Sequence, residues 1–193
     1  MSMLCKLYRI TPDHIPKLKD RPDALGELLD LAPPPSPKAS FLSRLLGRPA
    51  TQAPMPEREF APIAGSDIFE LDQAWHILHF LFSGSNTEGS WPSAFLMSGG
   101  EEIGPDRGYG PVRLLAPALS REISAFLNTR SFEALDAAYV ASDIEAAEIY
   151  WQASPEPTER QRQVDELWRV VSDLQAFFER TVQTDSATLV SIY

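Results

Sequence analysis

Hydrophobic residues recur along this chain in two patterns, and their order predicts an α+β fold. Apolar segments rich in β-branched and aromatic residues predict strands over 3–10, 112–116 and 188–193. Apolar residues at helical spacing predict helices after Pro12 and Ser131 and over 23–31, 67–83, 117–127, 143–151 and 159–183. We expect a small mixed or antiparallel sheet that joins the N- and C-terminal strands. Helices should cover it mainly on one face, and the longest helix should directly precede the last strand.

Capping residues refine the ends of two of these helices. Asp67 followed by Glu70 has the form of a capping box, which predicts that a helix begins there and ends at the C-cap Gly84. Thr158 followed by Gln161 has the same form and predicts the start of the longest helix.

Residues 33–62 differ from the rest of the chain, because they contain eight of its 17 prolines. This density of proline does not sustain regular structure. We interpret the segment as an insertion within a single domain that spans residues 1–193. Its hydrophobic residues Phe41, Leu45 and Leu46 are expected to pack on the domain or on a partner.

The length and composition place the chain among globular proteins of one domain, with 193 residues and 44% hydrophobic content. The chain has no apolar run of 18 residues, so we expect no membrane span. Lys6 and Arg9 interrupt the first apolar segment, which argues against a signal peptide. The lone Cys5 cannot form an intramolecular disulfide. These features predict a bacterial cytoplasmic protein.

The net charge of −10 is unevenly distributed. Residues 1–62 contain nine basic and seven acidic side chains, whereas residues 63–193 contain eight and twenty. The segment 131–159 has seven acidic residues and no Lys or Arg. Such a segment repels nucleic-acid phosphates and attracts basic proteins. The residues expected to contact a basic partner are Glu133, Asp136, Asp143, Glu145 and Glu148. The alternative is that these acids form a solvated helix face.

A second candidate site lies in the loop 98–111, which contains five of the ten glycines. Dense glycine allows a backbone to approach a ligand closely. Phosphate is not the expected ligand, because the loop has no Gly-Lys-Ser/Thr motif and carries Glu101, Glu102 and Asp106. A cationic or sugar-like ligand fits these charges. The alternative is a set of tight turns that lead into the strand 112–116.

Two histidines of the preceding helix could complete such a ligand pocket. In this hypothesis His76 or His79 acts as a base, Glu102 or Asp106 accepts hydrogen bonds, and Tyr109 stacks on the ligand. Asp72 precedes the histidines at helical spacing, which would suit a metal ion, but the His-Glu-x-x-His zinc motif is absent. We therefore expect no metal ion, and we expect no cofactor.

Two motifs carry a family resemblance. The segment from Trp75 to Gly84 reads W-H-x-L-H-x-L-x-x-G, and the segment from Gly99 to Pro111 reads G-G-x-x-I-G-x-D-x-G-Y-G-P. Both segments resemble the bacterial YfbM-like family, a domain of unknown function. The resemblance covers most of the chain outside 33–62. It implies a fold and does not imply a reaction.

Two functions are therefore compatible with the sequence. The first is a non-catalytic acidic binding protein, such as an immunity protein that neutralises a toxin by occluding its basic surface or active site. The second is a small-molecule-binding protein or enzyme centred on His76, His79 and the glycine-rich loop. The sequence favours the first function slightly, because the charge asymmetry is plain and the set of catalytic groups is incomplete.

Overall fold

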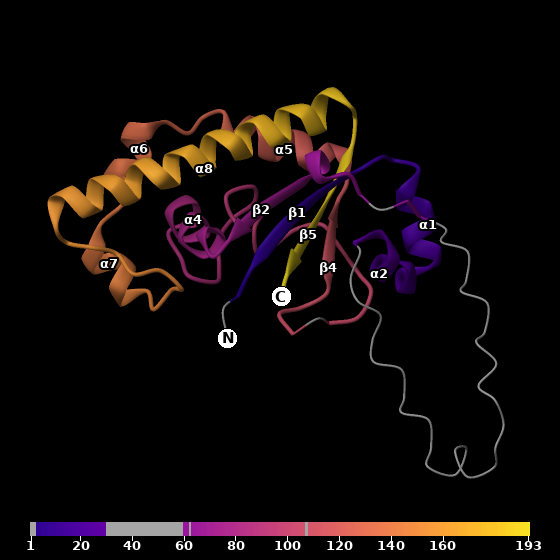
Figure 1. The fold of residues 1–193 in the computed structure, drawn as a ribbon, viewed down its shortest axis with the longest axis horizontal. Coiled ribbons are helices and arrows are strands. Elements are labelled where there is room, and N and C mark those ends of the chain that lie inside the picture. The colour runs from indigo at the N-terminus through magenta and orange to yellow at the C-terminus, as the bar shows by residue number, and fades with distance from the viewer. Residues whose placement is uncertain (1–2, 30–59, 62, 107) are drawn as a thin grey trace, which may run out of the picture.

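The computed structural model describes residues 3–29, 60–61, 63–106 and 108–193. Within them, five strands form one antiparallel sheet in the order β2-β1-β5-β4-β3 (Figure 1). The strands are β1 (Cys5–Ile10), β2 (Ile68–Asp72), β3 (Glu101–Ile103), β4 (Val112–Leu115) and β5 (Ala187–Ile192). The C-terminal β5 lies at the centre and pairs with β1 along its whole length. This pairing confirms the predicted union of the N- and C-terminal strands.

Helices pack on both faces of the sheet, and most of them lie on one face, the arrangement that the sequence predicted. They are α1 (His14–Asp20), α2 (Leu25–Leu28), α4 (Ala74–Ser83), α5 (Pro117–Leu127), α6 (Phe132–Ala138), α7 (Ala141–Ala146) and α8 (Pro157–Gln183), with short 3-10 turns η1 (Pro22–Ala24) and η2 (Gly65–Asp67). The larger hydrophobic core lies where α4, α5 and α8 pack on one face. A smaller core lies where α1 and α2 pack on the other face. The long α8 spans the molecule and leads directly into β5 (Figure 1).

Side chains of β1 point alternately to the two faces of the sheet, so this strand contributes residues to both hydrophobic cores. Cys5 and Leu7 point into the larger core, while Tyr8 and Ile10 point into the smaller one. All four are buried. A strand covered on both faces has apolar residues at successive positions, which is why β1 lacks the alternation of a half-exposed strand.

The predicted helix over 67–83 is wrong in its first third. Residues Ile68–Asp72 form β2, which pairs with β1, and α4 begins only at Ala74. Asp67 makes no capping hydrogen bond and instead accepts one from Nε of Arg9, at 2.9 Å. The backbone groups of this segment find partners in the edge of β1, so tertiary pairing overrides the local capping signal. The predicted helix end is confirmed, since Gly84 is the C-cap with φ of 76°.

Two further helix boundaries differ from prediction. The helix expected over 143–151 is the shorter α7, and the chain leaves helical geometry at Glu148, where φ is 53°. The cap of α8 is Glu156, whose carboxylate accepts hydrogen bonds from the N–H groups of Thr158 and Glu159. Pro157 then fills the first helical position, which needs no N–H donor. The Ser131 cap of α6 is confirmed by its hydrogen bond from Ala134 N, at 3.3 Å.

Most of the predicted insertion, including Phe41, Leu45 and Leu46, lies outside the described residues. The described chain resumes at Phe60, which is buried in the smaller core. Its ring lies 5.5 Å from that of His14 on α1. No helix among the described residues is both long and apolar enough to cross a membrane.

Candidate functional site

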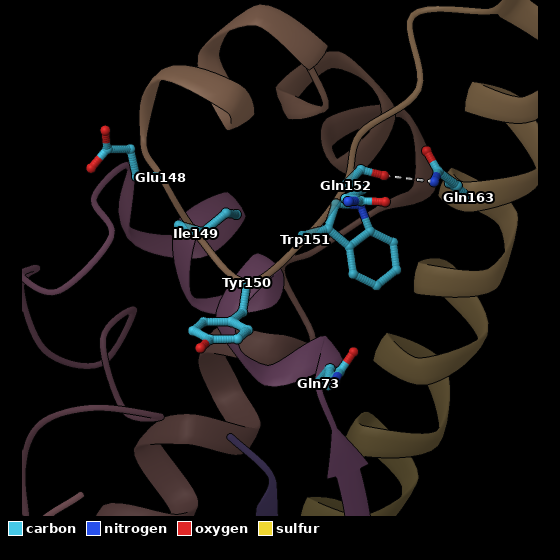
Figure 2. Close-up of a pocket in the computed structure, with 7 residues that line it drawn as sticks. All are labelled: Gln73, Glu148, Ile149, Tyr150, Trp151, Gln152 and Gln163. Atoms are coloured by element: carbon cyan, nitrogen blue, oxygen red, sulfur yellow. Dashed lines mark hydrogen bonds between the residues drawn. The ribbon is translucent and has the colours of Figure 1, made fainter. Parts of the chain in front are cut away.

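A depression of about 550 Å³ lies between the α7–α8 connection, the start of α4 and the first half of α8 (Figure 2). It is open to solvent, and its volume lies within the range of ligand pockets. Seven residues line it: Gln73, Glu148, Ile149, Tyr150, Trp151, Gln152 and Gln163. Five of these are consecutive, so the depression depends on how the segment 148–152 is held.

Gln163 fastens this segment to α8. Its Oε1 accepts hydrogen bonds from Ser154 N, at 3.0 Å, and from the Tyr139 hydroxyl, at 2.6 Å. Its Nε2 donates to the carbonyl oxygen of Gln152, at 2.9 Å (Figure 2). One amide side chain thus fixes three partners, so this wall is rigid.

Tyr139 extends the same network to Trp151. The buried Tyr139 hydroxyl accepts a hydrogen bond from Trp151 Nε1, at 3.0 Å. Burial raises the pKa of Tyr139, so the phenol keeps the proton that it donates to Gln163. Arg160 joins the same region to α6, because its guanidinium donates to the Asp136 carboxylate at 2.6 Å. It also donates to the Asp136 and Tyr139 carbonyl oxygens.

His76 holds the other side of the segment. The backbone N–H of Tyr150 donates to His76 Nδ1, at 3.1 Å. Since Nδ1 accepts this bond, Nε2 must carry the proton and donate to the Asn86 carbonyl oxygen, at 3.0 Å. Burial lowers the pKa of His76, which favours this neutral form. Asn86 in turn donates to the Ala147 carbonyl oxygen, at 3.1 Å.

The lining of the depression contains one acidic and two aromatic residues. Glu148 is its one charged lining residue, and Asp143 and Glu145 are exposed on the adjacent α7. Tyr150 is 46% exposed, and Trp151 is half-buried. Carboxylates combined with aromatic faces favour a cationic group. The titratable side chains of the lining are the Glu148 carboxylate and the Tyr150 phenol.

Comparison with known proteins identifies the fold. A family model described as a domain of unknown function (DUF1877) matches residues 1–191. The chain belongs to the DUF1877 family. The crystal structure of YfbM from Escherichia coli, a protein of unknown function, is similar to this DUF1877 chain with a TM-score of 0.65 and 13% identity. That match covers 98% of this chain and 99% of YfbM. Together with the family model, it confirms the predicted resemblance to the YfbM-like family. No curated protein matches the chain.

The five acids predicted to meet a partner lie on α6, on α7 and at the rim of the depression of the DUF1877 domain. Four of them are exposed: Glu133, Asp143, Glu145 and Glu148. Asp136 differs, because it is engaged by Arg160 within the molecule. Figure 1 shows α6 and α7 near one end of the long α8.

The residues of the alternative ligand pocket do not line the depression. His79 is fully buried in α4, its Nδ1 has no hydrogen-bond partner, and burial lowers its pKa to about 4. Glu102 lies on the edge strand β3 opposite Arg113, and Tyr109 is 45% exposed. Asp106 Oδ1 accepts hydrogen bonds from the backbone N–H groups of Gly108 and Gly110. This placement gives no support to a shared pocket.

The glycine-rich loop of this DUF1877 chain has a structural explanation in two places. Asp106 closes a tight turn, as the alternative interpretation expected. Gly99 has φ of 81°, and a Cβ atom there would clash with the Trp91 ring. Asp72, the third potential metal ligand, lies at the end of β2 and not on α4. The described residues contain no cluster of three metal-ligating side chains.

Sequence reasoning missed the residues that make the depression: Gln73, Tyr150, Trp151 and Gln163. A signal was present, since Tyr150 and Trp151 are adjacent aromatic residues within the acidic segment 131–159. The predicted helix over 143–151 concealed this signal, because it placed both aromatic residues on a helix, whereas α7 ends at Ala146.

Replacing Gln163 with leucine is expected to lower the free energy of unfolding of the DUF1877 domain by about 2 kcal/mol. The reason is that the Tyr139 hydroxyl, the Ser154 N–H and the Gln152 carbonyl oxygen each lose a hydrogen bond. Amide hydrogen exchange at Ser154 should accelerate as well. Gln161→Leu is the matched control, since Gln161 makes one exposed contact with Asp165. Equal effects of the two substitutions, measured by urea unfolding, would show that the network does not hold the segment.

Proposed function

We propose that this DUF1877 protein is a non-catalytic binding protein for a basic protein partner. The contact surface would be the acidic face, defined as the exposed carboxylates of Glu133, Asp143, Glu145 and Glu148 together with the depression. The observation that carries the proposal is the exposed Tyr150, which lies in the segment 131–159 that has no Lys or Arg and which lines an open depression whose charged lining residue is Glu148.

A protein ligand is favoured over a small molecule by the form of the depression. It is open to solvent, so it suits a group that projects from another surface. Tyr150 and Val140 are 46% and 42% exposed, and both lie in the acidic segment. Exposed aromatic residues surrounded by polar groups are typical anchors of protein interfaces.

A basic partner is favoured by charge. Carboxylates on one face steer a positively charged surface during encounter and repel acidic competitors. Arg160, which directly follows the acidic segment, is neutralised by Asp136 and does not oppose such a partner. The specific form that we propose is a cytoplasmic immunity protein that covers the basic surface or active site of a toxin. The free, buried thiol of Cys5 is compatible with that reducing compartment.

Charge reversal tests this function. The immobilised full chain would be exposed to the proteins of its bacterium, and captured proteins would be eluted by raising the salt concentration. We expect a basic protein whose association rate with the purified chain falls about tenfold in the double variant Glu145→Lys, Glu148→Lys. The association rate should also fall with ionic strength.

The matched control is the double variant Asp173→Lys, Glu179→Lys, which makes the same charge change at exposed positions of α8. It should bind nearly as the unaltered chain does. Binding that is independent of salt, or that is lost equally in both double variants, would contradict the proposed surface.

A further inference from the structure

We propose that the depression receives an arginine side chain of the partner. This inference rests on the proposed function and adds the chemical group that is recognised. The lining offers acceptors and aromatic faces and contains no cationic side chain. A guanidinium group uses both features, because it stacks on aromatic rings and presents planar, forked donors.

The hydrogen-bond acceptors are distributed around the opening. Glu148, Gln73 and Gln152 are all exposed, so their side-chain oxygens can turn toward a bound cation. Gln163 is different, because both ends of its amide are already engaged. It therefore forms a fixed wall, while the other three residues supply the acceptors.

The aromatic faces are held by the surrounding network. The Trp151 indole is anchored through Nε1 to the buried Tyr139 hydroxyl. The Tyr150 backbone is anchored to His76. Gln73, Tyr150 and Trp151 all line the depression, and in the view of Figure 2 the Gln73 side chain lies below the two rings. A guanidinium near Gln73 would therefore meet an acceptor and aromatic surface together, without reorganisation of the backbone.

Arginine is favoured over lysine for two physical reasons. Lysine ammonium is compact and strongly hydrated, so transferring it to a partly aromatic site costs more than transferring guanidinium. The acceptors here are also spread over three residues, which suits a planar group with five donors. The volume of about 550 Å³ leaves room for the backbone on either side of the arginine.

Nuclear magnetic resonance titration of the full chain tests the inference with capped Gly-Arg-Gly peptide as the probe. Backbone amides of residues 148–152 and the Trp151 indole N–H should shift saturably, with a dissociation constant in the millimolar range. The same peptide with citrulline, which is neutral and nearly isosteric, should bind at least about fivefold more weakly. The lysine peptide should bind about threefold more weakly than the arginine peptide.

Substitutions in the depression test which side chains contact the arginine peptide. Tyr150→Ala and Glu148→Gln should each weaken binding of the arginine peptide by about fivefold, whereas Tyr150→Phe, which keeps the ring, should bind normally. Tyr109→Ala is the matched control, because Tyr109 is 45% exposed and lies outside the depression. A dispersed spectrum verifies that each variant is folded.

Equal binding of the arginine, citrulline and lysine peptides would overturn the inference, and so would shifts centred elsewhere or no shift at all. If a basic protein is nevertheless captured through the acidic face, the proposed function stands while the arginine inference fails. If the peptide binds as expected but no basic protein is captured, the proposed function fails, and what stands is that the depression recognises a guanidinium group.

Discussion

Replacing Arg113 with methionine is expected to lower the free energy of unfolding by about 4 kcal/mol. Arg113 projects from β4 toward the turn 95–99 and donates to four of its carbonyl oxygens. The shortest contacts are 2.6 Å, to the carbonyl oxygens of Leu96 and Ser98. Hydrogen bonds from a charged donor are among the strongest in proteins, and methionine would leave all four acceptors without this partner.

The effect on the melting temperature follows from the size of the domain. A loss of 4 kcal/mol corresponds to a decrease of roughly 10 °C for a domain of this length. Burial lowers the pKa of Arg113 to about 10, so the guanidinium is still charged at neutral pH. The substitution therefore removes charged hydrogen bonds when unfolding is measured at neutral pH. Thermal and urea unfolding, followed by circular dichroism, measure the change.

Arg121 offers a matched control. Its guanidinium pairs with Asp185 at 2.6 Å, but the two side chains are 53% and 71% exposed. Exposed ion pairs contribute little, so Arg121→Met should cost less than about 1 kcal/mol. A cost for Arg113→Met as small as that for Arg121→Met would falsify the view that Arg113 holds the turn.

Acidification from pH 7 to pH 4 is expected to remove about 3 kcal/mol of stability through His79 alone. The pKa of this buried imidazole falls from 6.5 to about 4 in the folded chain, chiefly because burial disfavours the charged form. Between these pH values the unfolded chain binds a proton that the folded chain does not bind. Stability is therefore complete above pH 6.5 and declines as the pH falls toward 4.

Urea unfolding at a series of pH values measures this decline. The slope between pH 6.5 and pH 4 should be reduced in His79→Leu and much less affected in His14→Gln, since His14 is only half-buried. Both variants keep every acidic residue, and each lacks one histidine, so the difference between the slopes compares the fully buried His79 with the half-buried His14. Titration of the His79 ring near pH 6.5 in the folded chain, observed by magnetic resonance, would contradict the prediction directly.

The sequence predicted the sheet's centre better than its edges. β1, β4 and β5 are apolar segments whose own composition predicts strands. The edge strand β2 was concealed, because Asp67 and Glu70 have the spacing of a helix cap. In the structure Glu70 instead pairs with Lys6 across the strands, at 2.5 Å. That partner lies 64 residues away, so a local pattern could not reveal it.

Of the candidate site, the sequence predicted the acidic residues but not the depression. The acidic segment 131–159 could be counted directly, and it does border the depression. The depression itself requires Gln73, Gln163 and the segment 148–152 to converge from three parts of the chain. Sequence periodicity reports which residues are buried along one element, but it does not report which separate elements meet.

The central position of β5 has a consequence for the order of folding. In the described part of the chain, β5 (Ala187–Ile192) is the strand that joins the β2–β1 pair to the β4–β3 pair. Until β5 is in place, the two pairs are separate, and each has an unpaired edge. The register of β5 with β1 brings Cys5 opposite Ile192, and pairing across so long a separation is slow, so completion of the sheet should be a late step of folding.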